Sequence, residues 1–529
     1  MNVELATQIL KLLSQSGVAD YIVCAGARNA PFVKLLGQST GARVSHFFDE
    51  RAAGFFALGR ARRDGRPVAV ITTSGTAVAE LLPSAIEAFY TGVPLVFVTA
   101  DRPADFRGSA APQAIEQVGI YSHYTKMSFD ICELDQVTKI QLAADGMTHI
   151  NICFSEPLID NEVSSLDLSP PNWGLKISSA NSAVELEKTD KNFKKLKEQI
   201  QKLSKPLVVL GAIPSSYRSA IFEQLQTMQA PIYAEALSGL REAPELAAFT
   251  IRCGSDLLTP VEFSQNFDSV IRIGSVPTLR LWRDLEMSLQ STPVISVCDL
   301  PFSGLARGLN TLVTFEQWLQ NSKDLKFSHG ENILNRAQTI AAQKEQLLVD
   351  HPTAEPSFFK WLSAEIPQNS QVFLGNSLPI REWDFAATTH NKNFKILANR
   401  GANGIDGLIS TFLGSAKSEV ENWIILGDLS ALYDLNALVG ASLAEGHNLR
   451  VVVVNNGGGQ IFKKMFQDKN FINAHEIEFS KWAEMFSWDY VKVIKPETLQ
   501  LKPRPTVIEL CPSAATTELF WARYEELFR

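Results

Sequence analysis

Two polar stretches, each directly after an apolar run, hold the residues of this chain that are best suited to chemistry. The run WIIL (423–426) ends in Gly427-Asp428, and the run VVVV (451–454) ends in Asn455-Asn456 and three glycines. A helical pattern separates them, which predicts two parallel strands joined by a crossover helix, with both polar ends at one edge of a sheet. Carboxylate, amide and backbone oxygens suit Mg²⁺ that already carries a diphosphate. The alternative is a buried crossover in which the Asp only caps the helix.

This frame resembles the motif of thiamine-diphosphate (ThDP) enzymes, which opens on Gly-Asp and closes on Asn-Asn. Asp428 and Asn456 lie 28 positions apart, close to the spacing that is usual in those enzymes. Besides a metal, thiamine chemistry needs a carboxylate that hydrogen-bonds the aminopyrimidine ring and an apolar side chain that bends the cofactor. The sequence should therefore hold both of these side chains elsewhere.

Glu50 is the candidate carboxylate, and Ile405 is the candidate apolar side chain. Glu50 stands between the apolar run VSHFF and the apolar helix pattern AAGFFALG. Poor solvation there would raise its pKa and let it share a proton with the ring. The alternative for Glu50 is a helix-N-terminal acid that complements the helix dipole, and the alternative for Ile405 is an ordinary core residue. The local residues alone favour both alternatives.

The composition is that of a globular protein with several cores. The 529 residues are 45% hydrophobic and 20% charged, with a net charge of −8, which is ordinary for a chain of two to four domains. An acidic chain is not expected to take nucleic acid or an anionic membrane as its main partner. No signal peptide is evident, and no apolar run reaches the roughly 18 to 20 residues of a spanning helix. We therefore expect a cytoplasmic protein without stable membrane insertion.

The six cysteines and eight histidines show no metal-ligand spacing. No C-x-x-C pair and no H-x-x-x-H pair occurs in the sequence. The cysteines are therefore expected to be reduced core thiols, and not a disulfide framework or a zinc site.

Strand and helix patterns alternate along the chain, which predicts an α/β fold with mostly parallel, helix-covered sheets. Apolar runs predict strands in three sets, at 21–24, 44–50, 68–75, 94–100 and 149–154, then at 206–212, 231–236, 269–275 and 294–299, and then at 371–377, 394–401, 423–426, 451–454 and 506–511. The Ser-, Pro- and Lys-containing stretch at about 165–190 is interpreted as a linker. We therefore predict three doubly wound domains, at 1–180, 181–345 and 346–529.

Longer motifs make the resemblance more specific. RAAGFFALG, ADRP, GNSLPIR, NRGANGIDG and NNGGGQIF are similar to those of the 2-succinyl-5-enolpyruvyl-6-hydroxy-3-cyclohexene-1-carboxylate synthases of menaquinone biosynthesis. The resemblance implies a first domain that binds the pyrimidine of ThDP, a middle α/β domain, and a third domain that binds the diphosphate with Mg²⁺ or Mn²⁺. It implies a homodimer or homotetramer whose sites are shared between the first domain of one chain and the third of another. The implied reaction decarboxylates 2-oxoglutarate and adds the succinyl carbanion equivalent formed on ThDP to isochorismate by conjugate addition.

The resemblance also implies roles for individual residues. The implied metal ligands are Asp428, Asn456 and the backbone carbonyl of Gly458. The implied catalytic residues are Glu50, Gln113, Ser377 and Arg400. The implied cofactor contacts are Glu50, Ile405, Ser430, Asn456 and Gly458. The implied substrate contacts are Arg28, Arg102, Gln113, Arg280, Asn376, Ser377, Arg381, Arg400, Ile461 and Phe462. Both substrates are dianions, and the planar arginine fork binds carboxylates with two parallel hydrogen bonds, although a single arginine is usually a solvated surface residue.

Two departures from the family pattern bear on the site. The family usually has Pro-Gly-Ser-Arg-Ser where this chain has Ala25-Gly26-Ala27-Arg28-Asn29. The serine hydroxyl is therefore lost at Ala27, and Asn29 is the candidate substitute for its hydrogen bond. The stretch IFKKMFQDKNF replaces the usual Pro-containing continuation. It predicts a different cover over the site, to which Lys463 or Lys464 would add positive charge.

Three other functions are compatible with parts of the sequence. Another ThDP-dependent 2-oxo-acid decarboxylase, or an acetohydroxyacid-synthase-like enzyme, handles smaller acids and would not need so many arginines. A protein that binds NAD or a flavin is disfavoured because no strand–turn–helix junction carries G-x-G-x-x-G. A non-catalytic scaffold is disfavoured by the presence of Glu50, Asp428 and Asn456.

Overall fold

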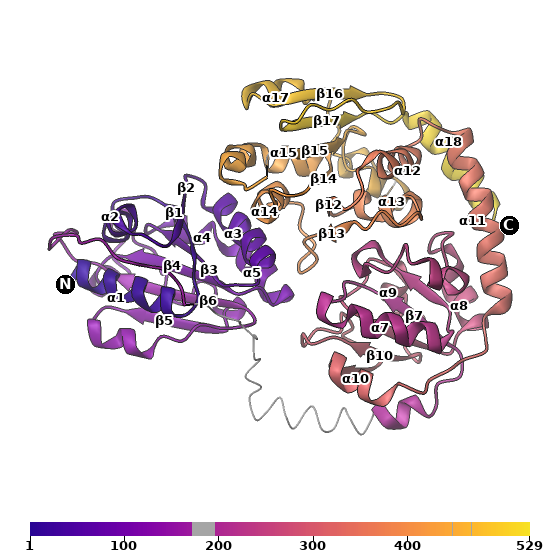
Figure 1. The fold of residues 1–529 in the computed structure, drawn as a ribbon, viewed down its shortest axis with the longest axis horizontal. Helices are drawn as coiled ribbons and strands as arrows, with labels where there is room; N and C mark the ends of the chain where they lie inside the picture. The colour runs from indigo at the N-terminus through magenta and orange to yellow at the C-terminus, as the bar shows by residue number, and fades with distance from the viewer. Residues whose placement is uncertain (172–195, 447, 467) are drawn as a thin grey trace. The chain divides into compact units, whose positions relative to one another are not determined.

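Three parallel sheets form the framework of the protein (Figure 1). The computed structural model describes residues 1–171, 196–446, 448–466 and 468–529, so most of the predicted linker lies outside the described residues. Each sheet falls within one of the three predicted segments, and all strand pairs in the described residues are parallel. The predicted α/β class with doubly wound sheets is therefore confirmed.

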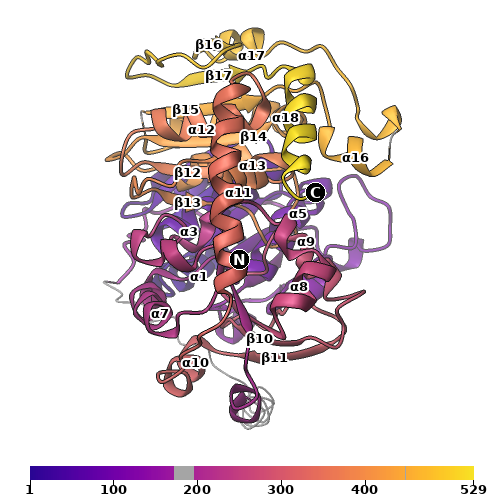
Figure 2. The same cartoon turned by 90° about the vertical axis from the view of Figure 1, so that its right-hand side faces the viewer.

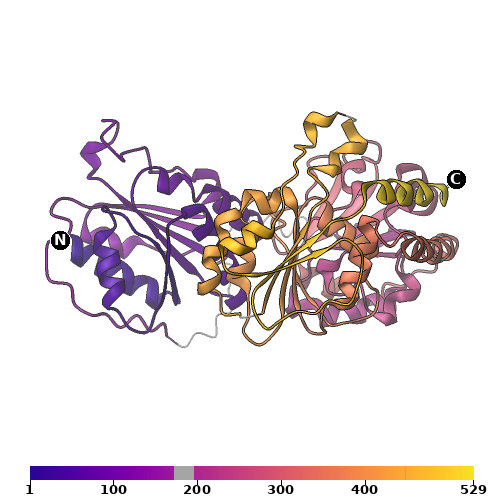
Figure 3. The same ribbon diagram turned by 90° about the horizontal axis from the view of Figure 1, so that it is seen from above.

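The N-terminal sheet has the strand order β2-β1-β3-β4-β6-β5. Its strands are β1 (Asp20–Cys24), β2 (Arg43–Phe47), β3 (Val68–Thr72), β4 (Leu95–Asp101), β5 (Met127–Ile131) and β6 (Met147–Cys153). Its helices are α1 (Asn2–Gln15), α2 (Ala30–Gln38), α3 (Glu50–Asp64), α4 (Thr76–Ala79) and α5 (Leu82–Thr91). Helices lie on both faces of this sheet (Figure 3). The central strands are fully buried because both faces are covered.

The middle sheet has the order β11-β10-β9-β7-β8. Its strands are β7 (Pro206–Leu210), β8 (Ile232–Ala234), β9 (Ser269–Ile273), β10 (Pro293–Val297) and β11 (Leu309–Val313). The helices of this segment are α7 (Ser215–Met228), α8 (Pro260–Asn266), α9 (Arg280–Asp284), α10 (Phe315–Asn321) and the long α11 (Glu331–Asp350). Separate apolar clusters fill the two faces of the sheet, as a doubly wound sheet requires.

The C-terminal sheet has the order β13-β12-β14-β15-β17-β16. Its strands are β12 (Gln371–Leu374), β13 (Lys395–Leu397), β14 (Asn422–Gly427), β15 (Leu449–Val454), β16 (Asp489–Val493) and β17 (Thr506–Leu510). Its helices are α12 (Glu355–Glu365), α13 (Leu378–Ala386), α14 (Leu408–Ser415), α15 (Asp428–Tyr433), α16 (Lys463–Phe466), α17 (Ser480–Met485) and α18 (Ala514–Glu526). Helix α18 lies beside α11 (Figure 2). When the strands of each segment are numbered along the chain, the N-terminal and C-terminal sheets have the same spatial order of strands. The sequence alone did not show this likeness.

The chain forms two compact units, and their boundaries cut across the C-terminal segment. The first unit comprises Met1–Ala180, Asn399–Ser418 and Ser430–His447, and the second comprises the remaining chain. Helix α14 therefore packs in the first unit, against α3. The predicted domain boundaries at 180 and 345 stay a prediction.

Two glycines allow the close approach of α3 and α14. A Cβ added at Gly59 would lie 2.0 Å from the Thr411 carbonyl oxygen, and a Cβ at Gly414 would lie 2.0 Å from the Phe56 carbonyl oxygen. Neither position has room for a side chain, so the helix crossing requires glycine on both sides. This contact fixes α14 against α3 within the same unit.

None of the helices in the described ranges combines the length and apolar character that crossing a membrane requires.

Candidate functional site

The two polar stretches with the best-suited residues meet at one edge of the C-terminal sheet. β14 and β15 are parallel neighbours with Gly427 opposite Val454, so the residues that follow each strand lie side by side. Asp428 Oδ2 accepts a hydrogen bond from the Gly458 amide at 2.8 Å. Asp428 Oδ1 accepts one from the Leu429 amide at 2.7 Å, at the start of α15. The crossover and the convergence of its two polar ends are confirmed.

The glycines after Asn456 keep this edge open to backbone contacts. Gly457 and Gly458 have φ values of +79° and +126°, which L side chains rarely adopt. A Cβ at Gly458 would lie 2.4 Å from the Ile472 carbonyl oxygen. Any other residue at 458 would therefore strain the backbone and displace the covering loop.

Glu355, which the sequence patterns did not single out, lies beside Asn456. The Nδ2 atom of Asn456 donates to both carboxylate oxygens of Glu355, at 3.1 and 3.0 Å. Burial raises the pKa of Glu355 to about 7, and the charge of Asp428 adds to this rise. Burial also raises the pKa of Asp428, while hydrogen bonds from Gly458 and Leu429 oppose the rise.

This arrangement fits a divalent cation with a diphosphate. Burial raises the pKa of both carboxylates, and the charge of Asp428 raises that of Glu355 further. A cation would relieve this repulsion between poorly solvated charges. The engaged Asn456 nitrogen leaves the oxygen of the same amide as a ligand for a hard cation. Asp428, Asn456 and Gly458 are thus suited to the roles that were predicted for them.

The loop after Phe462 covers the same carboxylate. His475 Nε2 lies 3.3 Å from Asp428 Oδ2, another contact that the sequence patterns missed. Lys463, expected to add positive charge to the site, pairs with Glu518. The Lys464 side chain, the other predicted source of positive charge, lies outside the described residues.

The β12–α13 turn reaches the same sheet edge. β12 pairs with β14, and Asn376 and Ser377 follow β12 at the start of α13. Asn376 is 1% exposed, and Ser377 has a φ of +72°. Arg381, one turn into α13, donates from Nη1 to the Ser377 carbonyl at 2.6 Å. The structure therefore brings these three predicted residues together beside β14.

Ile461 and Phe462 lie in a one-turn 3₁₀ helix, Gln460–Phe462. The Phe462 ring is 37% exposed and lies 5.9 Å from the ring of Phe466 and 6.3 Å from that of Phe471. Both residues come soon after the glycine turn in the chain. This position is consistent with an apolar wall beside the turn.

Arg280 differs from the other predicted residues. It begins α9 of the middle segment, its side chain is 81% exposed, and it faces Asp284 at 3.7 Å on the same helix. This is the solvated surface position that a single arginine usually occupies. A substrate contact of Arg280 stays a prediction.

In the first unit, Glu50 is the first residue of α3. The side chain of Asp49 accepts from the Ala52 amide at 3.0 Å and caps the helix, so Glu50 is not needed as the cap. Glu50 is half-buried, and burial raises its pKa, with smaller contributions from the charges of Asp49 and Glu80. The carboxylate therefore has the poorly solvated environment that its predicted role requires.

Arg28 is held firmly after β1. Its Nη1 donates to the Phe154 carbonyl at 3.0 Å and lies 3.2 Å from Glu156. Asn29 is fully buried, accepts from the Gly26 amide at 2.8 Å and donates to the Cys24 carbonyl at 2.9 Å. Both ends of the Asn29 amide thus bond its own loop, and a contact of Asn29 with a substrate stays a prediction.

Arg102 and Gln113 lie on the segment after β4. Arg102 Nε donates to the Pro112 carbonyl at 2.9 Å. Gln113 is exposed and has a φ of +57°. The buried Gln117, missed by the sequence patterns, accepts from the Gly75 amide at 2.9 Å and donates to Asn151. Gln117 thereby fixes the loop that presents both predicted residues.

Arg400 and Ile405 lie in the loop that leads to α14, in the same unit as Glu50. Glu87 holds this loop, because its carboxylate accepts from the amides of Gly401 at 2.9 and 3.0 Å and of Ala402 at 2.8 Å. Ile405 is half-buried, so it is neither a fully buried core residue nor a fully exposed surface residue. Ser430 is buried in α15.

Comparison with known proteins identifies the family. The family model described as thiamine pyrophosphate enzyme, N-terminal TPP binding domain, matches residues 3–120. The 2-succinyl-5-enolpyruvyl-6-hydroxy-3-cyclohexene-1-carboxylate synthase of Bdellovibrio bacteriovorus is 42% identical, covering 100% of this chain and 99% of the relative. The synthases of Akkermansia muciniphila and Chloroflexus aurantiacus are 34% and 31% identical, over 97% and 91% of this chain and 97% and 88% of the relatives. The chain therefore belongs to the 2-succinyl-5-enolpyruvyl-6-hydroxy-3-cyclohexene-1-carboxylate synthase family of thiamine-diphosphate enzymes.

Proposed function

We propose that the protein decarboxylates 2-oxoglutarate and joins the remaining succinyl unit to isochorismate, forming 2-succinyl-5-enolpyruvyl-6-hydroxy-3-cyclohexene-1-carboxylate for menaquinone biosynthesis. Thiamine diphosphate supplies the electron sink for this chemistry when it is bound. The observation that carries the proposal is the convergence of Asp428 and the Asn456–Gly458 turn at one sheet edge, in a chain whose full-length relatives bear this name.

Asp428, Asn456 and the Gly458 carbonyl would hold the metal, Mg²⁺ or Mn²⁺, and through it the diphosphate. The carboxylate and amide oxygens are hard ligands, and Asp428 is 2% exposed, so little water competes with the cation. Glu355 acts through Asn456 by orienting its amide. Ser430, at the start of α15, would bind the diphosphate end.

Glu50 would hold a proton at the aminopyrimidine ring. The burial that raises its pKa brings the carboxylate nearer to the proton affinity of the ring nitrogen, and proton sharing is most efficient when the two affinities match. Ile405, half-buried in a loop that Glu87 fixes, would bend the cofactor.

Arginines would bind the carboxylates of both substrates. Arg28 and Arg381 each use one N–H on a backbone carbonyl, which fixes the side chain and leaves further donors, because a guanidinium carries five. Arg102, Arg400 and Arg280 would add to this set. Gln113, Asn376 and Ser377 would hydrogen-bond the reacting groups, and Ile461 and Phe462 would exclude water beside them.

The active site would be shared between two chains, the first domain of one and the third domain of the other, in a homodimer or homotetramer. This part of the proposal is supported by the resemblance to the family. It is also consistent with the positions of Glu50 in the first unit and of Asp428 in the second.

Incubation of the full chain with ThDP, Mg²⁺, 2-oxoglutarate and isochorismate tests the proposal. Release of CO₂ together with the succinylated cyclohexene is the expected result. CO₂ release from pyruvate with none from 2-oxoglutarate would favour instead an acetohydroxyacid-synthase-like enzyme or another 2-oxo-acid decarboxylase.

A further inference from the structure

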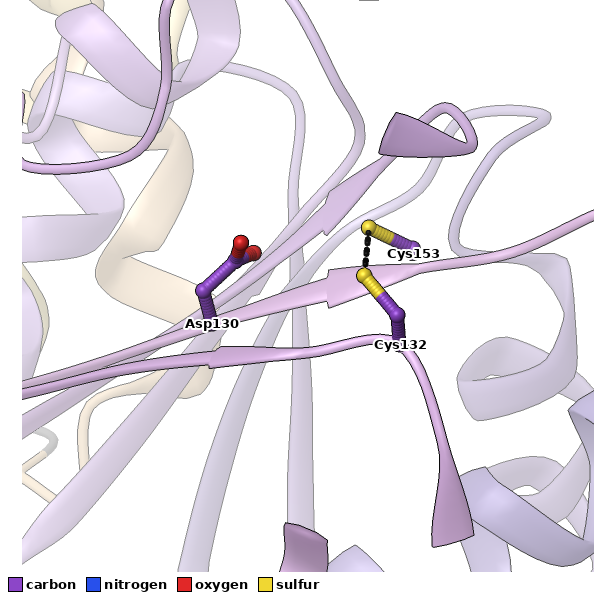
Figure 4. Close-up of side chains that lie close together, drawn as sticks. All are labelled: Asp130, Cys132 and Cys153. Carbon is purple, nitrogen blue, oxygen red and sulfur yellow. Dashed lines mark hydrogen bonds between the residues drawn. The ribbon is translucent and has the colours of Figure 1, made fainter. Parts of the chain in front are cut away.

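Two cysteines that the proposed reaction does not use lie against each other in the N-terminal sheet. Cys132 directly follows β5, Cys153 ends β6, and their Sγ atoms are 2.8 Å apart (Figure 4). The strands are parallel neighbours with Ile131 opposite Ile152, so positions 132 and 153 face each other. Neighbouring strands lie about 4.8 Å apart, within the Cα separation of about 4.4–6.8 Å that disulfides span. The backbone is therefore already in place for an S–S bond.

An ion pair between Arg107 and Asp130 lies beside Cys153. Arg107 Nη2 donates to Cys153 Sγ at 3.2 Å, and the same guanidinium donates to both carboxylate oxygens of Asp130 at 2.8 Å. A neighbouring cation stabilises a thiolate, which is the nucleophilic form, although burial raises the pKa of the Cys153 thiol. Cys132 is more exposed than Cys153, so a reagent from solvent meets Cys132 first.

The same cluster has the atom types of a metal site, but its charges disfavour a cation. Asp130, Cys132 and Cys153 place three ligand atoms within 4.8 Å of one another in the described part of the chain. Both oxygens of Asp130 already accept from Arg107, and Asn151 Nδ2 donates to one of them at 3.0 Å. A metal ion would have to displace a guanidinium and would still lack the fourth ligand of a structural zinc site.

We propose that Cys132 and Cys153 are a redox-active pair that closes into an intrachain disulfide on reaction with a low-molecular-weight disulfide. The Cys132 thiolate attacks one sulfur of the oxidant, which forms a mixed disulfide and releases the first small thiolate. The Cys153 thiolate then attacks Cys132 Sγ and releases the second. The two cysteines lose two electrons, the oxidant gains them, and the two departing thiolates take up the two protons that the cysteines lost.

The bond would form beside two of the proposed substrate arginines. Phe154, the residue after Cys153, accepts from Arg28 through its carbonyl at 3.0 Å and donates from its amide to the Asp101 carbonyl at 3.1 Å. Arg102 follows Asp101 in the chain. A covalent link between β5 and β6 would constrain this strand end. Oxidation is therefore expected to change the KM for a dianionic substrate, a consequence that rests on the proposed function.

The test exposes the reduced full chain to oxidised glutathione, followed by denaturation, alkylation and mass spectrometry. The expected result is that two of the six cysteines escape alkylation. The mass of the oxidised chain before alkylation should be about 2 Da lower than that of the reduced chain, because two hydrogens are lost. One cross-linked peptide pair should contain Cys132 and Cys153. Dithiothreitol should restore all six. Cys132→Ser should abolish the cross-link, whereas Cys511→Ser, which removes another half-buried thiol, should leave it intact.

Three results would overturn the proposal. All six thiols could stay reactive after oxidation, glutathione could remain attached to Cys132, or the reduced chain could bind one equivalent of added Zn²⁺ that requires Cys132 and prevents the cross-link. Mass spectrometry reads the bond without any substrate. A cross-link in a chain that lacks synthase activity would therefore contradict the proposed function alone, and an unchanged KM would contradict the coupling alone.

Discussion

The carboxylate of Glu355 and the amide of Asn456 are joined by two hydrogen bonds, of 3.1 and 3.0 Å, across 101 positions of sequence. This contact engages the nitrogen of the amide and so turns its oxygen toward other partners. Outer-shell contacts of this kind orient metal ligands and are worth about 10–100-fold in metal affinity.

Glu355→Gln should therefore weaken Mg²⁺ binding in the presence of ThDP by about 10–100-fold. In the variant, an NH₂ group of glutamine would replace one of the two oxygens that accept from Asn456 Nδ2. Two donors would then face each other, and the Asn456 amide would lose its orientation. Calorimetric titration of Mg²⁺ measures the loss. The exposed Glu497→Gln removes the same charge and should leave the affinity unchanged, and equal affinities for both variants would show that Glu355 does not position the ligand.

Glu50→Gln should slow exchange of the C2 proton of bound ThDP by at least about 10²-fold, the usual contribution of a positioned acid or base. The amide cannot share a proton as a carboxylate does, while its shape is retained, so cofactor affinity should change little. Exchange into deuterated water followed by NMR measures the rate. Glu4→Gln in α1 is the control. Wild-type exchange in the Glu50 variant would remove this residue from the mechanism.

Gly414→Ala should destabilise the protein by about 1–3 kcal/mol, the usual effect of overpacking. The added methyl group would lie 2.0 Å from the Phe56 carbonyl oxygen, so α3 and α14 would have to separate. Gly37→Ala in α2, where nothing lies within 4 Å of the added Cβ, should instead be neutral or stabilise by up to about 1 kcal/mol. Thermal unfolding compares the two, and equal melting temperatures would refute the close helix contact.

His149 should make the N-terminal segment less stable as the pH falls. It is 1% exposed, its Nε2 lies 2.8 Å from Thr99 Oγ1, and burial lowers its pKa from 6.5 to about 4. The unfolded chain takes up the proton first, so stability is complete above about pH 6.5 and is lost between there and about pH 4, by up to about 3 kcal/mol.

Thermal unfolding of wild type and His149→Gln across this pH range isolates that contribution. The advantage of the wild type over the variant should shrink as the pH falls, because glutamine does not titrate. A difference that is constant from pH 7 to pH 4 would show that His149 is not held neutral by the fold.

The strands that the sequence patterns missed are all edge strands, whereas every central strand and the edge strands β2, β8 and β13 were predicted. β5, β11 and β16 lie at the edges of their sheets, and most of their residues are partly or fully exposed. Fully covered strands such as β4 and β15 each contain a run of four apolar residues, which is easier to recognise. An edge strand with polar residues resembles a loop in sequence.

The candidate site divides in a similar way. Asp428 and Asn456 could be predicted because each directly follows an apolar run and the strands are neighbours. Glu355 could not, since it reads as an ordinary acid at the start of a helix and meets Asn456 only through the fold. The pairing of Cys132 with Cys153 depends on β5, which the sequence patterns missed. The role of Asn29 depends on the buried turn that it stabilises.

Calorimetric titration of the full chain with ThDP, in the presence and absence of Mg²⁺, tests the central claim most directly. If Asp428, Asn456 and Gly458 hold metal and diphosphate together, ThDP should bind with Mg²⁺ and lose that affinity when EDTA removes the metal, and Asp428→Asn should lose it as well. Binding of ThDP that is equally tight without a divalent cation, or in Asp428→Asn, would contradict the account.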